Sequence, residues 1–226
     1  MGIDQVTKVT ASTIRMPRRL ADHVRSGMIA AAVLAFVTGT AMAATEGPRE
    51  VVRRLADDVL AVLKQKTLAS DAKRDRIEQL VYAGVDFETL SRLVLARNWS
   101  RFSADEQASF QKEFKQHLSV TYGKSIDSYK NEDLAITGDR EEARGDWTVK
   151  TKVVRGGSDD IVVDYRLRQA EGRWKIIDFV VEGVSLVANF RSQFQDILAS
   201  KSPRELIALI HDKNVKGEDF KSAAKG

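Results

Sequence analysis

Apolar residues change their spacing within residues 172–198, and this change predicts a strand followed by a helix. From Trp174 to Val181 both alternating sets of positions are largely apolar, which is typical of a strand covered on both faces. Glu182-Gly183 interrupts the run. Apolar residues then recur at helical spacing, at Val187, Phe190, Phe194, Ile197 and Leu198. We therefore expect a buried strand that turns over a glycine into an amphipathic helix.

Helical spacing also dominates residues 44–130. Pro48 stands where the first turn of a helix often has proline, and Asp86 is placed to cap another helix. Ser103 and Glu106 form the pattern of a capping box. The helix that follows this box is the longest expected, with apolar or aromatic residues at Phe110, Phe114, Leu118, Tyr122, Ile126 and Tyr129.

The period changes to two in residues 131–182, where short runs alternate between apolar and polar positions. Tight turns at residues 155–158 and 170–172 separate these runs, so we expect neighbouring antiparallel strands. Residues 183–214 return to helical spacing, with a second capping box at Ser202 and Glu205. The prediction is an α+β fold with one domain over residues 44–214 and a flexible tail over 215–226.

The first 43 residues have the pattern of a secretory signal peptide. Arginines precede a short apolar run from Met28 to Val37, and Ala41-Met42-Ala43 ends the segment. The apolar run is too short to span a bilayer, so we predict cleavage after Ala43 and export to the periplasm. Because this leader carries five basic and two acidic residues, most of the net charge of +4 is removed with it. The remaining charge gives no basis for binding nucleic acid.

The segment after Gly172 carries a longer and more specific string of residues. It reads Trp-Lys-x-x-Asp from Trp174, then Glu-Gly-Val-Ser-Leu-Val from Glu182 and Asn-Phe-Arg-Ser-Gln-Phe from Asn189. This string resembles the signature of the MlaC family, also called toluene-tolerance auxiliary proteins. The resemblance extends in weaker form over residues 48–213.

The MlaC resemblance implies a periplasmic phospholipid carrier that needs no cofactor and performs no catalysis. Its expected partners are phospholipid, an outer-membrane lipoprotein–porin complex and an inner-membrane ABC-transporter complex with an MCE-domain subunit. The carrier would act as a monomer and maintain the lipid asymmetry of the outer membrane. The implied fold is a strongly curved sheet of about four strands, NTF2-like or cystatin-like, with an added helical part.

Candidate catalytic residues are scarce. The chain has no cysteine and three histidines, and no nucleophile, metal-ligand or phosphate-binding motif occurs. Asp178 is the exception, since a carboxylate among apolar strand positions can have a raised pKa and act as a base. An NTF2-like enzyme that uses Asp178 is therefore one alternative. The other interpretation is that Asp178 accepts hydrogen bonds from a backbone turn or from Arg191, which belongs to the same signature and makes a structural pair with it.

The MlaC resemblance also implies a cleft that holds acyl chains. Alternation places Lys150, Lys152, Asp164, Arg166 and Arg168 in water, so the opposite face of the sheet is expected to contact lipid. The predicted lipid-binding residues on that face are Trp147, Val149, Val153, Val163, Tyr165 and Leu167. Those predicted on the covering helices are Phe114, Leu118, Tyr122, Val184, Leu186, Val187 and Phe190. The remaining alternative is an interaction module whose core has no cavity.

Overall fold

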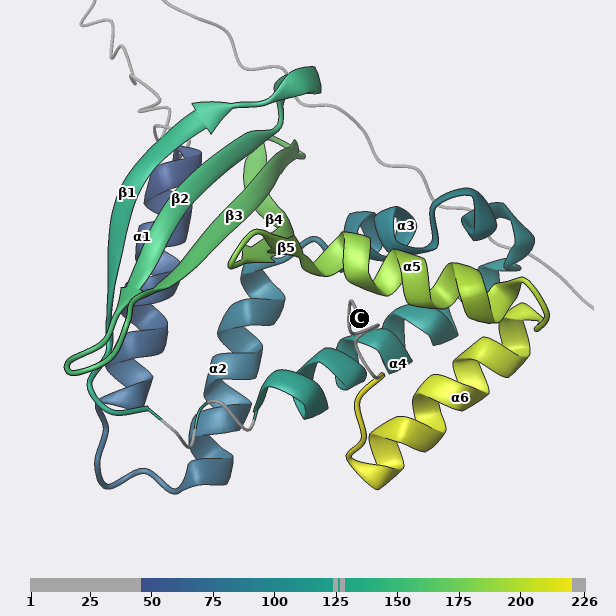
Figure 1. Ribbon diagram of the computed structural model, residues 1–226, viewed down its shortest axis with the longest axis horizontal. Coiled ribbons are helices and arrows are strands. Elements are labelled where there is room, and N and C mark those ends of the chain that lie inside the picture. Colours follow the sequence, from purple (N-terminus) through teal and green to yellow (C-terminus); the bar gives the residue numbers. More distant parts are fainter. Residues whose placement is uncertain (1–45, 124–125, 127–128, 221–226) are drawn as a thin grey trace, which may run out of the picture. The chain divides into compact units, whose positions relative to one another are not determined.

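The computed structural model describes residues 46–123, 126 and 129–220. The predicted leader, 1–43, lies outside these residues. The elements before the sheet are the helices α1 (Pro48–Leu63), α2 (Ser70–Gly84), α3 (Phe87–Leu95) and α4 (Ala104–Gly123), with the 3-10 helix η1 (Ala96–Arg101) between α3 and α4. The strands are β1 (Asp133–Glu141), β2 (Trp147–Val154), β3 (Ile161–Ala170), β4 (Arg173–Val181) and β5 (Val184–Ser185), with the short helix η3 (Ala143–Gly145) between β1 and β2. The chain continues into α5 (Leu186–Leu198) and α6 (Pro203–Lys216) (Figure 1).

The five strands form one antiparallel sheet in the order β1-β2-β3-β4-β5. The predicted α+β class and antiparallel pairing are confirmed, whereas the sheet has five strands rather than about four. The additional strand arises because Glu182 and Gly183 both have positive φ, 48° and 80°, and turn the chain back on itself. Val184 and Ser185 then pair with Val181 and Val180. Strong curvature and the NTF2-like or cystatin-like form of the sheet stay predictions.

Local capping rules account for the starts of three helices. The Asp86 carboxylate accepts a hydrogen bond from the Thr89 backbone N–H at 2.9 Å and begins α3. Both reciprocal bonds of a capping box are present at Ser103 with Glu106, before α4, and at Ser202 with Glu205, before α6. These three predictions are confirmed, since a cap depends only on residues a few positions apart.

The hydrophobic core lies under the sheet and continues between the C-terminal helices. Helix α1 packs against β1, β2 and β4, and its side chains Val51, Val52 and Leu55 are buried. A cluster of aromatic rings joins α4 to α5, with ring centroids 5.0 to 5.7 Å apart, and consists of Phe110, Phe114, Phe190 and Phe194. The described residues belong to one compact unit.

Two element ends differ from the expected positions. Helix α4 ends at Gly123, so Ile126 and Tyr129 do not extend its apolar face, and glycine is a poor helix former at that point. Helix α6 continues to Lys216 and is followed by Gly217 in the left-handed conformation. Phe220 then packs against Phe194 at 5.4 Å between ring centroids, so the described part of the predicted tail contacts the core.

Candidate functional site

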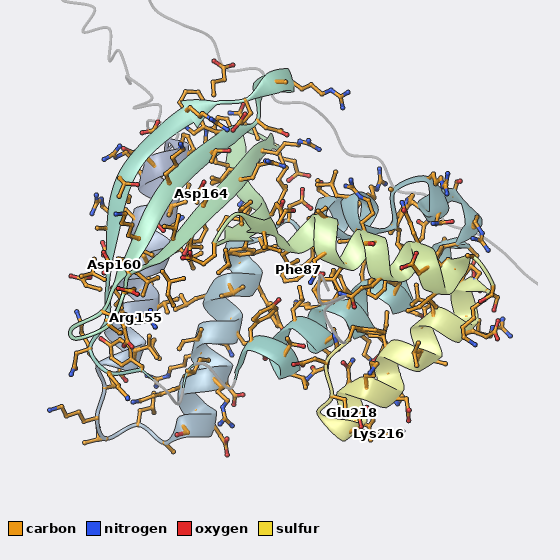
Figure 2. All side chains as sticks on the ribbon, in the orientation of Figure 1. Phe87, Arg155, Asp160, Asp164, Lys216 and Glu218 are labelled. Atoms are coloured by element: carbon orange, nitrogen blue, oxygen red, sulfur yellow. The ribbon has the colours of Figure 1, made fainter. Side chains whose placement is uncertain are left out.

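A cavity of about 970 Å³ lies between α2, α4 and the β4–β5 turn. Its volume is at the upper end of the range of about 300 to 1,000 Å³ for small-molecule sites. Phe87, at the start of α3, contributes to its wall (Figure 2). The apolar and aromatic residues that line it are Ile77, Val81, Tyr82, Val85, Phe87, Leu90, Leu118, Val120, Tyr122, Ile126, Phe179, Val181, Val184 and Leu186.

The spacing of residues within each element explains why these side chains meet. Ile77 and Val81 are four residues apart on α2 and therefore project from the same face of that helix. Leu118 and Tyr122 have the same relation on α4. Phe179 and Val181 are two residues apart on β4 and share one face of the sheet. Three separate elements thus present apolar faces to one partly open cavity.

Polar groups at the cavity are held in fixed positions. The Tyr82 hydroxyl and the Ser119 hydroxyl are 2.8 Å apart and share a hydrogen bond. Burial raises the pKa of Tyr82 to about 12. The Lys115 ammonium lies 3.5 Å from the centroid of the Tyr82 ring, and the Phe87 ring meets the same ring edge to face at 5.4 Å. The wall therefore combines a large apolar area with a few ordered polar groups.

Exposed apolar side chains indicate where the cavity opens. Tyr122, Val181 and Val184 line the cavity, and their exposed fractions are 48%, 43% and 61%. Val181 and Val184 face each other across the β4–β5 turn. Large apolar groups exposed together are typical of a surface that contacts apolar ligands or partners.

Four of the thirteen predicted lipid-binding residues line the cavity, namely Leu118, Tyr122, Val184 and Leu186. Five others are buried in the hydrophobic core: Phe114, Val149, Leu167, Val187 and Phe190. Trp147 and Tyr165 pack against that core, and Val153 and Val163 are half-buried on the sheet. The six sheet positions do share one face, as the pairs Trp147 with Leu167 and Val149 with Tyr165 show. Helix α1 covers part of that face, and the face reaches the cavity on β4, through Phe179 and Val181, which pair with Tyr165 and Val163.

The cavity residues that the sequence prediction missed come mainly from α2 and β4. Ile77 and Val81 were recognisable as an inward apolar face, and Phe179 and Val181 as alternate positions of a strand. Such patterns indicate burial, but they do not distinguish a side chain that packs on protein from one that borders a hollow.

Asp178 is buried in β4 and accepts hydrogen bonds from residues at the start of α5. Its two carboxylate oxygens accept hydrogen bonds from the Ser185 hydroxyl at 2.6 Å and from the Val187 backbone N–H at 3.0 Å. The Arg166 guanidinium lies 3.8 Å away. The predicted pair with Arg191 is corrected, since the Arg191 Nε donates to the Leu93 carbonyl at 2.8 Å. Arg191 lies farther along α5 and donates to a carbonyl in the last turn of α3. Asp178 instead accepts a hydrogen bond from a backbone N–H in the first turn of α5, as the backbone-turn interpretation predicted.

The described part of the chain holds no group of three side chains arranged to bind a metal ion. Among those same residues, no helix is both long and apolar enough to cross a membrane.

Comparison with known proteins gives one family and several relatives. The model of the family described as MlaC protein matches residues 53–212. The toluene tolerance protein ttg2D of Pseudomonas putida is 27% identical over 160 residues, which cover 69% of this chain and 74% of that protein. The intermembrane phospholipid transport system binding protein MlaC of Haemophilus influenzae is 23% identical over 180 residues, covering 76% and 84% of the two chains.

A solved structure shares the fold. It is the phospholipid-binding protein of Ralstonia solanacearum in complex with a phospholipid, and it is similar with a TM-score of 0.68 at 24% sequence identity. The likeness covers 75% of this chain and 97% of that one.

Proposed function

The chain belongs to the MlaC family, and from this premise we propose that it is a periplasmic phospholipid carrier. The acyl chains would occupy the cavity between α2, α4 and the β4–β5 turn. The observation that carries the proposal is this large apolar cavity in a chain whose family match spans residues 53–212. The relatives named for phospholipid transport and phospholipid binding support it.

The energetics of lipid transfer explain why such a carrier needs a deep apolar cavity. Each methylene group removed from water contributes about 0.8 kcal/mol, so two acyl chains contribute roughly 20 kcal/mol. A bilayer already provides most of this stabilisation. The carrier must therefore enclose the acyl chains about as completely as the bilayer does, and the apolar side chains of Ile77, Val81 and Leu118 fit that requirement.

The exposed apolar rim of the cavity is where lipid would enter and leave. Tyr122, Val181 and Val184 would meet the membrane complexes that supply and receive the lipid. We propose that these are the outer-membrane lipoprotein–porin complex and the inner-membrane ABC transporter with its MCE-domain subunit. In this cycle the chain is exported by its N-terminal leader, works in the periplasm as a monomer and keeps the outer membrane asymmetric.

The alternatives to a carrier find less support. The chain is not an enzyme, since the family to which it belongs consists of lipid-binding transport proteins. Both carboxylate oxygens of Asp178, the residue expected to act as a base in that alternative, already accept hydrogen bonds from Ser185 and Val187. An interaction module without a cavity does not agree with the cavity of about 970 Å³ between α2, α4 and the β4–β5 turn.

The proposal is tested by analysing what the protein carries. The full chain is expressed in a bacterial host, the exported protein is purified from the periplasm, and its organic extract is analysed by mass spectrometry. We expect phospholipid in a fixed molar ratio to protein, and uptake of lipid from liposomes by protein that has been stripped of it. Protein that carries no phospholipid and takes none from liposomes would show that the proposal is wrong.

A further inference from the structure

The apolar cavity is open at its rim and closed where α2 is followed by α3. The rim side chains Tyr122, Val181 and Val184 are exposed. Val85, directly after α2, also lines the cavity but is only 6% exposed, and Leu90 of α3 lines it and is fully buried. A side chain that borders a cavity and yet meets almost no water lies at its closed part. We refer to Val85 and Leu90 as the end wall.

Hydrogen bonds hold the chain in place at the end wall. The Val85 backbone N–H donates to the Val81 carbonyl of α2 at 2.9 Å. The next N–H, that of Asp86, donates to the Ile176 carbonyl of β4 at 2.9 Å. The Asp86 carboxylate in turn accepts a hydrogen bond from the Thr89 N–H in the first turn of α3. The backbone at Val85 is therefore tied to α2, α3 and β4 together.

Close packing against α1 supports the same junction. Gly84, the last residue of α2, lies against Leu55 of α1, and a Cβ at Gly84 would be 3.3 Å from the Leu55 side chain. Leu55 and Leu90 are themselves buried in the core. Because such an interior has few voids, Val85 has no free space into which it could move when a ligand presses on it. The end wall is therefore rigid.

We propose that the end wall limits the length of the acyl chains that the protein carries. Chains that enter through the rim end at Val85, so the cavity selects lipids by acyl-chain length. This inference rests on the proposed function and adds a substrate preference to it.

A rigid end wall gives a sharp limit, because the bilayer competes for every methylene group. Up to the limit, an added methylene is removed from water in the cavity as well as in the bilayer, so the partition of the lipid between them stays the same. Beyond the limit, the added methylene has no place in the cavity, whereas the bilayer still accommodates it. One methylene contributes about 0.8 kcal/mol, so each excluded group lowers the partition into the protein about fourfold.

The test is a competition among lipids that differ only in chain length. Protein stripped of lipid is incubated with vesicles that contain equal amounts of phosphatidylcholines with two identical monounsaturated chains, from myristoleoyl to erucoyl in steps of two carbons. The protein is then repurified, and the bound lipids are quantified by mass spectrometry against internal standards. We expect similar loading of the shorter lipids and then a drop of at least about fourfold at one step of the series.

Two variants move the end wall in opposite directions, and a third serves as the matched control. Val85→Ala deepens the closed part of the cavity and should raise the loading of the first excluded lipid about fourfold or more. Val85→Leu makes the cavity shallower and should exclude the longest lipid that the unaltered protein accepts. Val52→Ala makes the same change as Val85→Ala at a buried residue of α1 outside the cavity, and it should keep the limit of the unaltered protein. Circular dichroism shows which variants are folded, and either Val85 variant suffices for the comparison.

The possible results separate the chain-length inference from the carrier proposal. Lipid uptake without a drop anywhere in the series, or a drop at the same chain length in the Val85 variants as in the unaltered protein, overturns the end wall and leaves the carrier in place. A shift in Val52→Ala as large as that in Val85→Ala also overturns it, since a loosened core would then be the cause. Absence of any lipid refutes the carrier and the end wall together.

Discussion

Replacement of Asp178 by asparagine tests the structural role assigned to this carboxylate. Asp178 is almost fully buried, and each of its oxygens accepts one hydrogen bond, from Ser185 and from Val187. Asparagine keeps an acceptor oxygen for the Val187 N–H, and its amide N–H₂ can donate to the Ser185 hydroxyl, but the negative charge is lost. The two hydrogen bonds lose their charge assistance and the Arg166 guanidinium, 3.8 Å away, loses its partner, so we expect the free energy of unfolding to fall by about 1 to 2 kcal/mol. At about 2 to 4 °C per kcal/mol, the melting temperature should fall by about 2 to 8 °C.

The assay is thermal unfolding followed by circular dichroism, combined with a double-mutant cycle. Ser185→Ala removes the hydroxyl that donates to Asp178 and also caps α5 through the Ala188 N–H. Because the two residues contact each other, their combined effect should differ from the sum by about 1 to 2 kcal/mol. Asp159→Asn, at an exposed position in the β2–β3 hairpin, is the matched control and should leave the melting temperature unchanged. A melting temperature for Asp178→Asn within 1 °C of the unaltered protein would refute this reasoning.

Three further predictions concern the cavity, the buried His117 and Tyr82. Val81→Trp fills the apolar cavity and should lower the bound lipid per protein at a stability cost of about 1 to 3 kcal/mol, whereas Val154→Trp at an exposed strand end should not. Because burial lowers the pKa of His117 in the folded state, the unfolded chain binds more protons below its own pKa of about 6.5. Stability should be fully present above that pH and fall below it by at most about 1.4 kcal/mol per pH unit, and His117→Asn should remove this contribution. Tyr82→Phe removes the hydrogen bond to Ser119 and should cost about 1 kcal/mol in chemical denaturation. Burial raises the pKa of both Tyr82 and Tyr165 to about 12, so the variant should reduce the absorbance change near that pH and leave the part due to Tyr165.

Each of these predictions has a result that would contradict it. Full lipid occupancy in a folded Val81→Trp protein would place the acyl chains elsewhere. An unchanged slope of stability against pH in His117→Asn would mean that other groups cause the slope. A phenol titration in the Tyr82→Phe protein identical to that of the unaltered chain would mean that the pKa of Tyr82 is not raised.

Local rules predicted most of the secondary structure correctly. The capping boxes at Ser202 and Glu205 and at Ser103 and Glu106 depend on residues three apart, and the alternation in β2 and β3 follows directly from the geometry of a strand. Strand β5 was missed because two residues are too few to show a period. Its pairing depends on the positive φ of Glu182, which the identity of a glutamate does not indicate.

The site was harder to predict, because the same pattern of apolar residues describes both a filled and a hollow interior. Val149 and Leu167 were expected to face lipid, and they are indeed buried, but against protein, since α1 covers their face. Leu118 and Tyr122 came from an equally apolar helix and do line the cavity. Only the packing of α1 against the sheet, which involves residues far apart in the sequence, distinguishes the two cases. For Asp178 the residue type was informative, because a carboxylate among apolar neighbours requires donors, but the choice of donor was decided by the turn into α5.

The location of the acyl chains is tested most directly by single-cysteine labelling, since the chain has no cysteine of its own. A small trifluoromethyl tag is placed in turn at Val81→Cys in the cavity, at Val153→Cys on the sheet face of β2, two strands away from β4, and at Lys152→Cys on the opposite face. Each tagged protein is loaded with phospholipid that carries a nitroxide near the end of one acyl chain, and ¹⁹F relaxation is measured by NMR. The account predicts strong relaxation enhancement at Val81→Cys and little at the other two positions. Strong enhancement at Val153→Cys with none at Val81→Cys, in protein that has taken up the lipid, would contradict it.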